Sequence, residues 1–252
     1  VMKSANYRNG EFKNQHETLL MTSDRGRFSG IWEFIFRKID GLRPEQAVKA
    51  IKTDLRKIGR NEEILVWFGH SSYLIQTGGK RILVDPVFCM ASPVSFVNKP
   101  FKGTELYTPD DMPDIDYRVI SHDHWDHLDY NTVKKLKDRI GAVICPLGVG
   151  EHFEYWGFDK ERLIELDWNE DANLAPGFMI HCLPARHFSG RRLTANQSLW
   201  ASFLLEAPSQ KIYIGGDGGY DTHYAEIGNR FPGIDLAILE NGQYNEEWSL
   251  IH

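Results

Sequence analysis

Short apolar runs separated by turn residues dominate the chain from residue 64 onward. Runs of this length that are rich in β-branched and aromatic residues predict strands, and they lie at 64–68, 73–77, 81–84, 115–120, 142–145, 163–166, 179–183, 199–206, 211–214 and 234–239. Gly78-Gly79 between the second and third runs predicts a tight hairpin. Helical patterns occupy 132–140, 149–156 and 222–230. Strand meanders interrupted by helices indicate two packed sheets with helices outside them.

The first quarter of the chain has a different pattern. Residues 1–43 scatter aromatic side chains among polar ones, which predicts an irregular N-terminal arm that wraps the domain. Residues 44–59 then predict a helix that Pro44 opens and Gly59 closes, with one apolar stripe formed by Val48, Ile51, Leu55 and Ile58. The sequence therefore divides into an arm, 1–43, and a single folded domain, 44–252.

The most informative segment is Ser-His-Asp-His-Trp-Asp-His-Leu-Asp-Tyr at 121–130, directly after the predicted strand at 115–120. It places His122, His124, Asp126 and His127 within six positions. Imidazole suits zinc, and a carboxylate extends the choice to iron or manganese. One cation cannot easily use all four side chains of so short a loop, whereas two adjacent cations can. The pattern favours a two-cation site over a solvated, histidine-rich surface loop.

The H-x-H-x-D-H spacing resembles the signature of the metallo-β-lactamase fold superfamily. A closer resemblance is to one branch, the N-acyl-phosphatidylethanolamine-hydrolysing phospholipase D and its bacterial relatives. It covers roughly residues 60–252 and is carried by 67–71, 83–88, 120–131, 145–148, 165–168, 184–191 and 215–220. The resemblance implies an α/β protein with a four-layer αβ/βα sandwich and metals at one edge, between the sheets.

Two further residues lie just past predicted strands, where loops carry function. His187 follows the strand at 179–183, and Asp217 follows the strand at 211–214. The family pattern implies that His187 joins His122 and His124 on one metal and that Asp217 bridges to a second metal. Asp126 and His127 hold that second metal in the same pattern.

The resemblance also has a gap at the C-terminus. The family has a last ligand histidine on a later strand, and this sequence ends at His252. His252 aligns better with a histidine near the active-site mouth than with that ligand. We therefore expect that the C-terminal part of the second half is missing here, or that the second metal site is weak.

Other residues are expected to support the metals. Asp85, at a strand end, is the best partner for the free ring nitrogen of a ligand histidine. His70 resembles a histidine that faces the metal pocket, and Arg191 suits two-point contact with phosphate. Asp123 either orients the ligand loop or is solvated, while Asp129 is expected to be structural.

These assignments predict a metal-dependent hydrolase, most readily a zinc enzyme. A metal-bridging hydroxide, oriented by Asp126 and Asp217, would attack phosphorus or a carbonyl carbon. The resemblance implies a phosphodiesterase of phospholipase D type acting on a small-molecule or phospholipid diester. A lactonase or other carbonyl-ester hydrolase, and a non-catalytic metal-binding relic, remain as alternatives.

An acyl-binding face is one reading of the apolar residues in the arm and after residue 93. The residues concerned are Phe12, Phe28, Trp32, Phe34, Phe36 and the stretch 94–101. Ordinary packing is the favoured interpretation for most of them.

The overall composition limits the classes of partner and the compartments that are expected for this chain. A net charge of −6 disfavours nucleic-acid binding, which needs a basic face. No apolar run approaches the ~18 residues that span a bilayer, which predicts a soluble chain. The three cysteines are widely spaced, so a catalytic or structural-zinc role is not expected for them. The chain starts with Val and not Met, so a cytoplasmic protein and a periplasmic or membrane-associated one, processed from a longer chain, both stay open, as do a homodimer and peripheral membrane contact.

Overall fold

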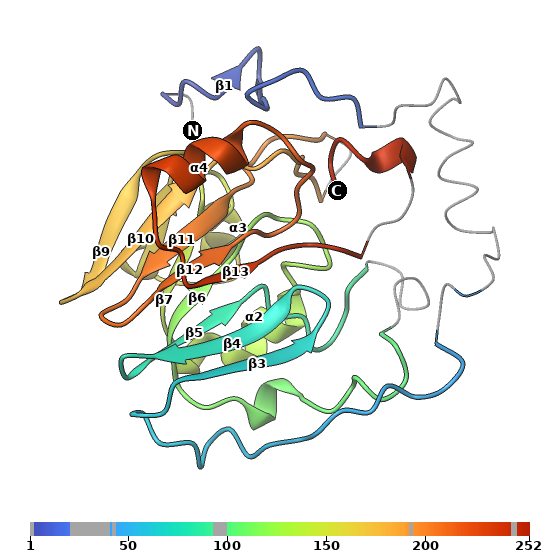
Figure 1. Ribbon diagram of the computed structural model, residues 1–252, viewed down its shortest axis with the longest axis vertical. Coiled ribbons are helices and arrows are strands. Elements are labelled where there is room, and N and C mark those ends of the chain that lie inside the picture. Colours follow the sequence, from blue (N-terminus) through green and yellow to red (C-terminus); the bar gives the residue numbers. More distant parts are fainter. Residues whose placement is uncertain (1–2, 21–40, 42–43, 93–99, 192–193, 243–245) are drawn as a thin grey trace.

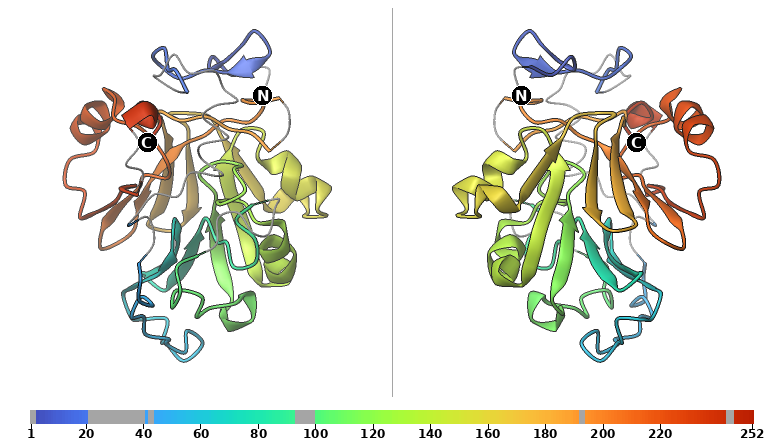
Figure 2. Two further views of the ribbon diagram at one scale, coloured as in Figure 1. Left: turned by 90° about the vertical axis from the view of Figure 1, so that its right-hand side faces the viewer. Right: turned by 90° about the vertical axis from the view of Figure 1, so that its left-hand side faces the viewer.

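The computed structural model describes residues 3–20, 41, 44–92, 100–191, 194–242 and 246–252. Two β-sheets lie face to face, and helices cover their outer sides (Figures 1 and 2). The N-terminal segment crosses one end of this sandwich.

The first sheet contains six strands in the order β3-β4-β5-β6-β7-β8. Their bounds are β3 Ile64–Gly69, β4 Ser72–Thr77, β5 Lys80–Val84, β6 Ile115–Val119, β7 Ile140–Pro146 and β8 Leu163–Leu166. The first three pair antiparallel, and β5 to β8 pair parallel. Gly78 and Gly79 have φ of 52° and 78°, so the tight hairpin expected between β4 and β5 is confirmed.

The second sheet contains five strands in the order β13-β12-β11-β10-β9. Their bounds are β9 Asp171–Ala175, β10 Phe178–Leu183, β11 Ser202–Glu206, β12 Lys211–Ile214 and β13 Leu236–Ile238. Only β12 and β13 pair parallel. Strand β9 was not predicted, because its Asp-Ala-Asn-Leu-Ala sequence lacks the β-branched and aromatic residues that mark strands.

Successive side chains along a strand point to opposite faces of its sheet, and the buried ones form three separate hydrophobic clusters. In β4, Tyr73 and Ile75 face the second sheet, whereas Leu74 faces the opposite side of the first sheet. The inter-sheet core also takes Ile180 and Phe203 from the second sheet. Because an apolar face must be buried on each side of a sheet, the chain forms helix, sheet, sheet and helix layers. The predicted α/β four-layer sandwich is confirmed.

In the part of the chain that the structure describes, three α-helices form the outer layers. Helices α2 (Tyr130–Leu136) and α3 (Gly150–Tyr155) pack on the first sheet through Val133, Leu136 and Phe153. Helix α4 (His223–Arg230) packs on the second sheet through Ile227. The 3-10 helices are η1 Pro109–Asp111, η2 Lys137–Arg139, η3 Lys160–Arg162 and η4 Glu246–Trp248.

The described part of the N-terminal arm, residues 3–20, contains a small sheet that the sequence did not indicate. Strands β1 (Tyr7–Arg8) and β2 (Glu11–Phe12) pair antiparallel. The side chain of Phe12 is fully buried in the inter-sheet core, so it packs and does not form an acyl-binding surface. Phe101 is exposed, and the other residues considered for that surface, Phe28, Trp32, Phe34, Phe36 and 94–99, lie outside the described residues.

The helix predicted over 44–59 is wrong. All sixteen of these residues are described, and none is helical. Ile51 is 88% exposed, whereas Leu55 is buried in the core beneath the first sheet. Backbone groups of the segment form hydrogen bonds with the 101–110 region instead. The Val48 N–H donates to the Lys102 carbonyl at 2.7 Å, and the Thr53 N–H donates to the Tyr107 hydroxyl at 2.8 Å. Tertiary contacts therefore outweigh the helical pattern.

Two further expectations concern membranes and thiols. Among the residues described, the structure has no helix long and apolar enough to cross a bilayer. Cys145 and Cys182 are buried and Cys89 is exposed, and all three are free thiols.

Candidate metal centre

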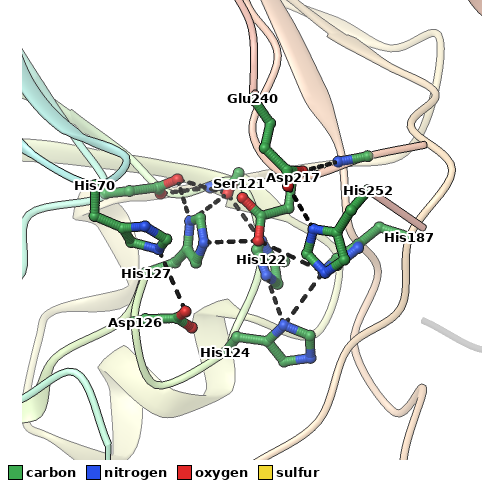
Figure 3. Close-up of polar contacts among 12 residues, drawn as sticks. His70, Ser121, His122, His124, Asp126, His127, His187, Asp217, Glu240 and His252 are labelled. Atoms are coloured by element: carbon green, nitrogen blue, oxygen red, sulfur yellow. Dashed lines mark hydrogen bonds and ion pairs between the residues drawn. The ribbon is translucent and has the colours of Figure 1, made fainter. Parts of the chain in front are cut away.

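The metal-site residues predicted from sequence lie together at one edge of the sandwich. Asp85 follows β5 and the histidine loop follows β6, two parallel strands whose carboxyl ends share an edge. Strands β10 and β12 both run antiparallel to β11, so His187 and Asp217 also emerge at a common edge. Figure 3 shows the side chains from both sheets pointing toward one another.

The first cluster consists of three imidazoles. The ring Nε2 of His122 lies 2.8 Å from Nδ1 of His124, and His187 Nε2 lies 3.3 Å from the same nitrogen. All three donor atoms lie within 4.8 Å of one another. His122 and His187 are buried, and His124 lies at the edge of the cluster.

The second cluster consists of Asp126, His127 and His70. His70 Nε2 lies 3.3 Å from an Asp126 oxygen. His70 comes from the β3–β4 turn, where it adopts a left-handed φ of 47° directly after Gly69 at 112°. This uncommon backbone pair aims the imidazole across the sheet edge at the histidine loop.

Asp217 lies between the two clusters. One of its carboxylate oxygens lies 3.1 Å from His127 Nε2 and 4.0 Å from His187 Nε2. His122, His127 and Asp217 form a further donor group, as do His187, Asp217 and His252. The carboxylate is therefore placed where it can serve both clusters, as a bridging ligand would.

The donor set fits divalent cations. Bonds of about 2.0–2.1 Å in a tetrahedral centre put donor atoms about 3.3 Å apart. The separations of His187 from His124 and of His70 from Asp126 match this value, whereas His122 and His124 lie closer together, at 2.8 Å. Imidazole nitrogens and carboxylate oxygens are the ligands of zinc, iron and manganese sites. The facing nitrogens of His122 and His124, at 2.8 Å, can form a hydrogen bond only if one of them carries a proton. If both bound the same cation, neither would need one.

Burial prepares the first cluster for a cation. It lowers the pKa of His124, holds the pKa of His122 well below its usual range, and lowers the pKa of His187 to about 3. These imidazoles are therefore neutral near pH 7, the form in which histidine binds metals.

The carboxylates are held in the ionised form. Burial favours a raised pKa for Asp217, but the neighbouring His127 overcomes it and holds this pKa well below the usual range. His70 and His127 similarly lower the pKa of Asp126 against the effect of burial. Burial opposes charge on His127, yet Asp217 and Asp85 raise its pKa well above the usual value.

Buried partners fix the orientation of the rings. Asp85 accepts a hydrogen bond from Nδ1 of His127 at 2.8 Å and from the backbone N–H and hydroxyl of Ser121 at 2.8 and 2.6 Å. This contact leaves Nε2 of His127 facing Asp217. His187 Nδ1 contacts the Ile251 carbonyl at 2.8 Å, which leaves its Nε2 facing the cluster.

Arg191 lies under the histidine loop. Its guanidinium stacks over the Trp125 ring at 3.9 Å and donates to the backbone carbonyls of Asp123 and Leu128. The structure thus shows Arg191 holding the loop, while its role toward phosphate stays a prediction. Asp123 is buried between His152 and the Gly190 N–H, so its side chain is not solvated. Asp129 caps helix α2, the structural role expected of it.

Sequence reasoning missed several supporting residues. Ser121 adjoins the motif and was open to prediction. His152 and Glu240 lie far from it in sequence, and no local signal marks them. Glu240 contacts His252 Nδ1 at 2.6 Å and accepts from the Gly218 N–H at 3.1 Å, so it links His252 to the Asp217 loop.

Comparisons with known proteins agree with this geometry. Residues 80–252 match the family model described as the beta-lactamase superfamily domain. The chain is 38% identical over 256 residues to an uncharacterized protein of Mycobacterium tuberculosis, covering 99% of this chain and 68% of the relative.

Two further similarities concern named proteins. The chain is 32% identical over 197 residues to N-acyl-phosphatidylethanolamine-hydrolyzing phospholipase D 1 of Caenorhabditis elegans, covering 72% of this chain and 54% of that protein. The structure resembles that of Igni18, a metallo hydrolase from the archaeon Ignicoccus hospitalis, with a TM-score of 0.53 and 20% identity over 71% of each chain. At this identity, the structural likeness shows the fold alone.

Proposed function

We propose that this chain, a metal-dependent hydrolase that belongs to the beta-lactamase superfamily and has the metallo-β-lactamase fold, cleaves a phosphodiester bond. The observation that carries the proposal is the pair of donor clusters joined at Asp217. A carboxylate shared in this way suits two adjacent cations. The similarity to the nematode phospholipase D supports a diester as the substrate.

The residues of the candidate centre have separate roles as cation donors and as partners that orient the donors. His122, His124 and His187 would hold one cation, and Asp126, His127 and His70 the other, with Asp217 between them. Bound as a pair, such cations would acidify water and stabilise the negative charge that develops during hydrolysis. Asp85 and the Ile251 carbonyl keep the rings in place for that task. The reaction adds water across one phosphorus–oxygen ester bond and releases an alcohol and a phosphomonoester.

Three exposed apolar side chains from segments that carry site residues support a phospholipid as the diester. Trp67 is 65% exposed and donates its indole N–H to the His70 carbonyl at 2.7 Å, so it lies beside the second cluster. Tyr220 on the Asp217 loop and Leu239 next to Glu240 are also exposed. Large apolar side chains around a polar site are suited to an acyl chain or the lipid interface.

A substrate panel tests the proposal. The chain loaded with zinc, manganese or iron is assayed on a chromogenic phosphodiester, on a phospholipid in mixed micelles and on a lactone. We expect diester hydrolysis that chelation abolishes and that His124→Ala removes, because His124 belongs to the first cluster. His181→Gln, which changes a histidine of β10 outside the site, serves as the control and should retain activity. Turnover of the lactone without the diesters would instead favour the carbonyl-ester alternative.

A further inference from the structure

The loop that carries His187 is held by the N-terminal arm, which lies outside the matched family stretch of 80–252. The side chain of Asn14 forms hydrogen bonds to both backbone groups of His187. Its Nδ2 donates to the His187 carbonyl at 2.8 Å, and its Oδ1 accepts from the His187 N–H at 3.2 Å. The contacts span 173 positions of sequence, so they join two parts of the fold.

A third contact fixes the orientation of this amide. The Asn14 Oδ1 also accepts from the indole N–H of the buried Trp200 at 3.0 Å. Two donors face the oxygen and one acceptor faces the nitrogen, so rotating the amide by half a turn would lose all three contacts. The Asn14 amide therefore pairs with the N–H and the carbonyl of His187, as the backbone of a neighbouring strand would. These two bonds fix the position of the His187 Cα, from which the ring projects.

The next arm residues contact the same region. Thr18 accepts from Arg186 Nε at 3.0 Å, and the Glu17 carbonyl accepts from Arg186 Nη2 at 3.2 Å. His16 pairs with Asp221 at 2.9 Å, on the loop that follows Asp217. Arg186 also donates to the Tyr220 carbonyl at 3.2 Å, which ties the two loops together.

We propose that residues 14–18 form a strap that fixes the first cation cluster, with Asn14 as the positioning residue for His187. The strap crosses the loops that carry His187 and Asp217, which are the donors supplied by the second sheet. Because cation affinity depends on donor positions being set before binding, residues that hold the ligands from outside contribute strongly to it. The proposal rests on His187 as a cation donor and is independent of the substrate.

Zinc affinity of the full chain tests the strap. Competition with a chromophoric chelator gives the binding steps, and His187→Ala identifies the step that belongs to the first cluster. We expect Asn14→Ala to weaken that step by about 10–100-fold. Asn14→Asp, which keeps the size and the acceptor oxygen but loses the donor to the His187 carbonyl, should also weaken it.

A matched control separates positioning from general anchoring of the arm. Asn6 lies in the same arm and donates from Nδ2 to Asp167 at 2.8 Å, away from the cation clusters. We expect Asn6→Ala to leave zinc affinity within about twofold of the wild-type value, whatever it does to the thermal unfolding of the metal-free protein.

Two results would contradict the proposal that the strap fixes the first cluster. Wild-type zinc affinity in both Asn14 variants is one, and an equal loss in Asn6→Ala and Asn14→Ala is the other. If His187→Ala itself binds zinc like the wild type, the assigned cation site fails, which is a separate outcome.

Discussion

Replacing Asp85 with Asn isolates the contribution of one buried carboxylate to cation binding. Asp85 is fully buried and accepts three hydrogen bonds, from His127 Nδ1, the Ser121 N–H and the Ser121 hydroxyl. Asn has nearly the same shape but only one acceptor oxygen and no charge. If the amide oxygen stays on the Ser121 N–H, the NH2 group takes the position of the oxygen that accepts from His127 Nδ1. The ring then loses the acceptor that keeps its Nε2 toward Asp217.

The expected loss follows from the role of such partners. Removing a carboxylate that orients a ligating imidazole costs about 10–100-fold in metal affinity, or about 1.4–2.7 kcal/mol. We expect zinc titration of Asp85→Asn to show this weakening in the step assigned to His127. Diester hydrolysis should fall at sub-saturating zinc and recover in part at excess zinc.

Asp129→Asn provides the matched comparison. Asp129 is also buried and also accepts several hydrogen bonds, but it caps helix α2 and receives the Cys89 N–H. Asn caps a helix as well as Asp does, so the cost comes from the hydrogen bonds that the second carboxylate oxygen accepts from the Cys89 N–H and the Thr132 hydroxyl. The free energy of unfolding should fall by about 1–3 kcal/mol with little change in zinc affinity. Unchanged zinc affinity in a folded Asp85→Asn variant would refute the reasoning.

The remaining predictions concern other parts of the molecule. His70→Ala removes one of three donors of the second cluster, so elemental analysis after dialysis should show loss of one cation while the first is retained; two retained cations would exclude His70 as a donor. Arg191→Lys loses the stacking on Trp125 and the planar donor array, and urea unfolding should show a loss of about 1–3 kcal/mol; unchanged stability would contradict the loop-holding role. Burial lowers the pKa of His223, so below about pH 6.5 the unfolded chain takes up a proton that the folded chain resists. Unfolding free energy should therefore fall as the pH drops below this value, and His223→Gln should reduce the slope; an identical slope would contradict the assignment.

Strands such as β4, β5 and β11 were predictable because their apolar runs are buried, whereas β3 was recognised despite the exposed side chains of Leu65 and Trp67. Leu163–Leu166 and Lys211–Ile214 match the predicted ranges, and most other boundaries differ by one to three residues. The two failures have different causes. Residues 44–59 are set by contacts with the 101–110 region, which local periodicity does not report. Strand β9 pairs with the adjacent β10, but its own sequence lacks the residues that mark strands.

The metal-site side chains were predictable because their spacing is chemically uncommon. His122, His124, Asp126 and His127 gather in one loop, and His187 and Asp217 follow strands whose ends meet at the same edge. Nothing local distinguishes Asn14 or His152, because their contacts depend on how loops cross in the folded chain. Sequence thus reveals the residues that gather at the candidate centre, and much less of what holds them in place.

Cation stoichiometry tests the central claim most directly. Elemental analysis of zinc-loaded protein after exhaustive dialysis compares the wild type with Asp217→Asn, which weakens the carboxylate shared by the two clusters. We predict two tightly bound cations per chain in the wild type and fewer than one in the variant. A wild-type chain without a tightly bound cation, or a variant that retains both, would contradict the account.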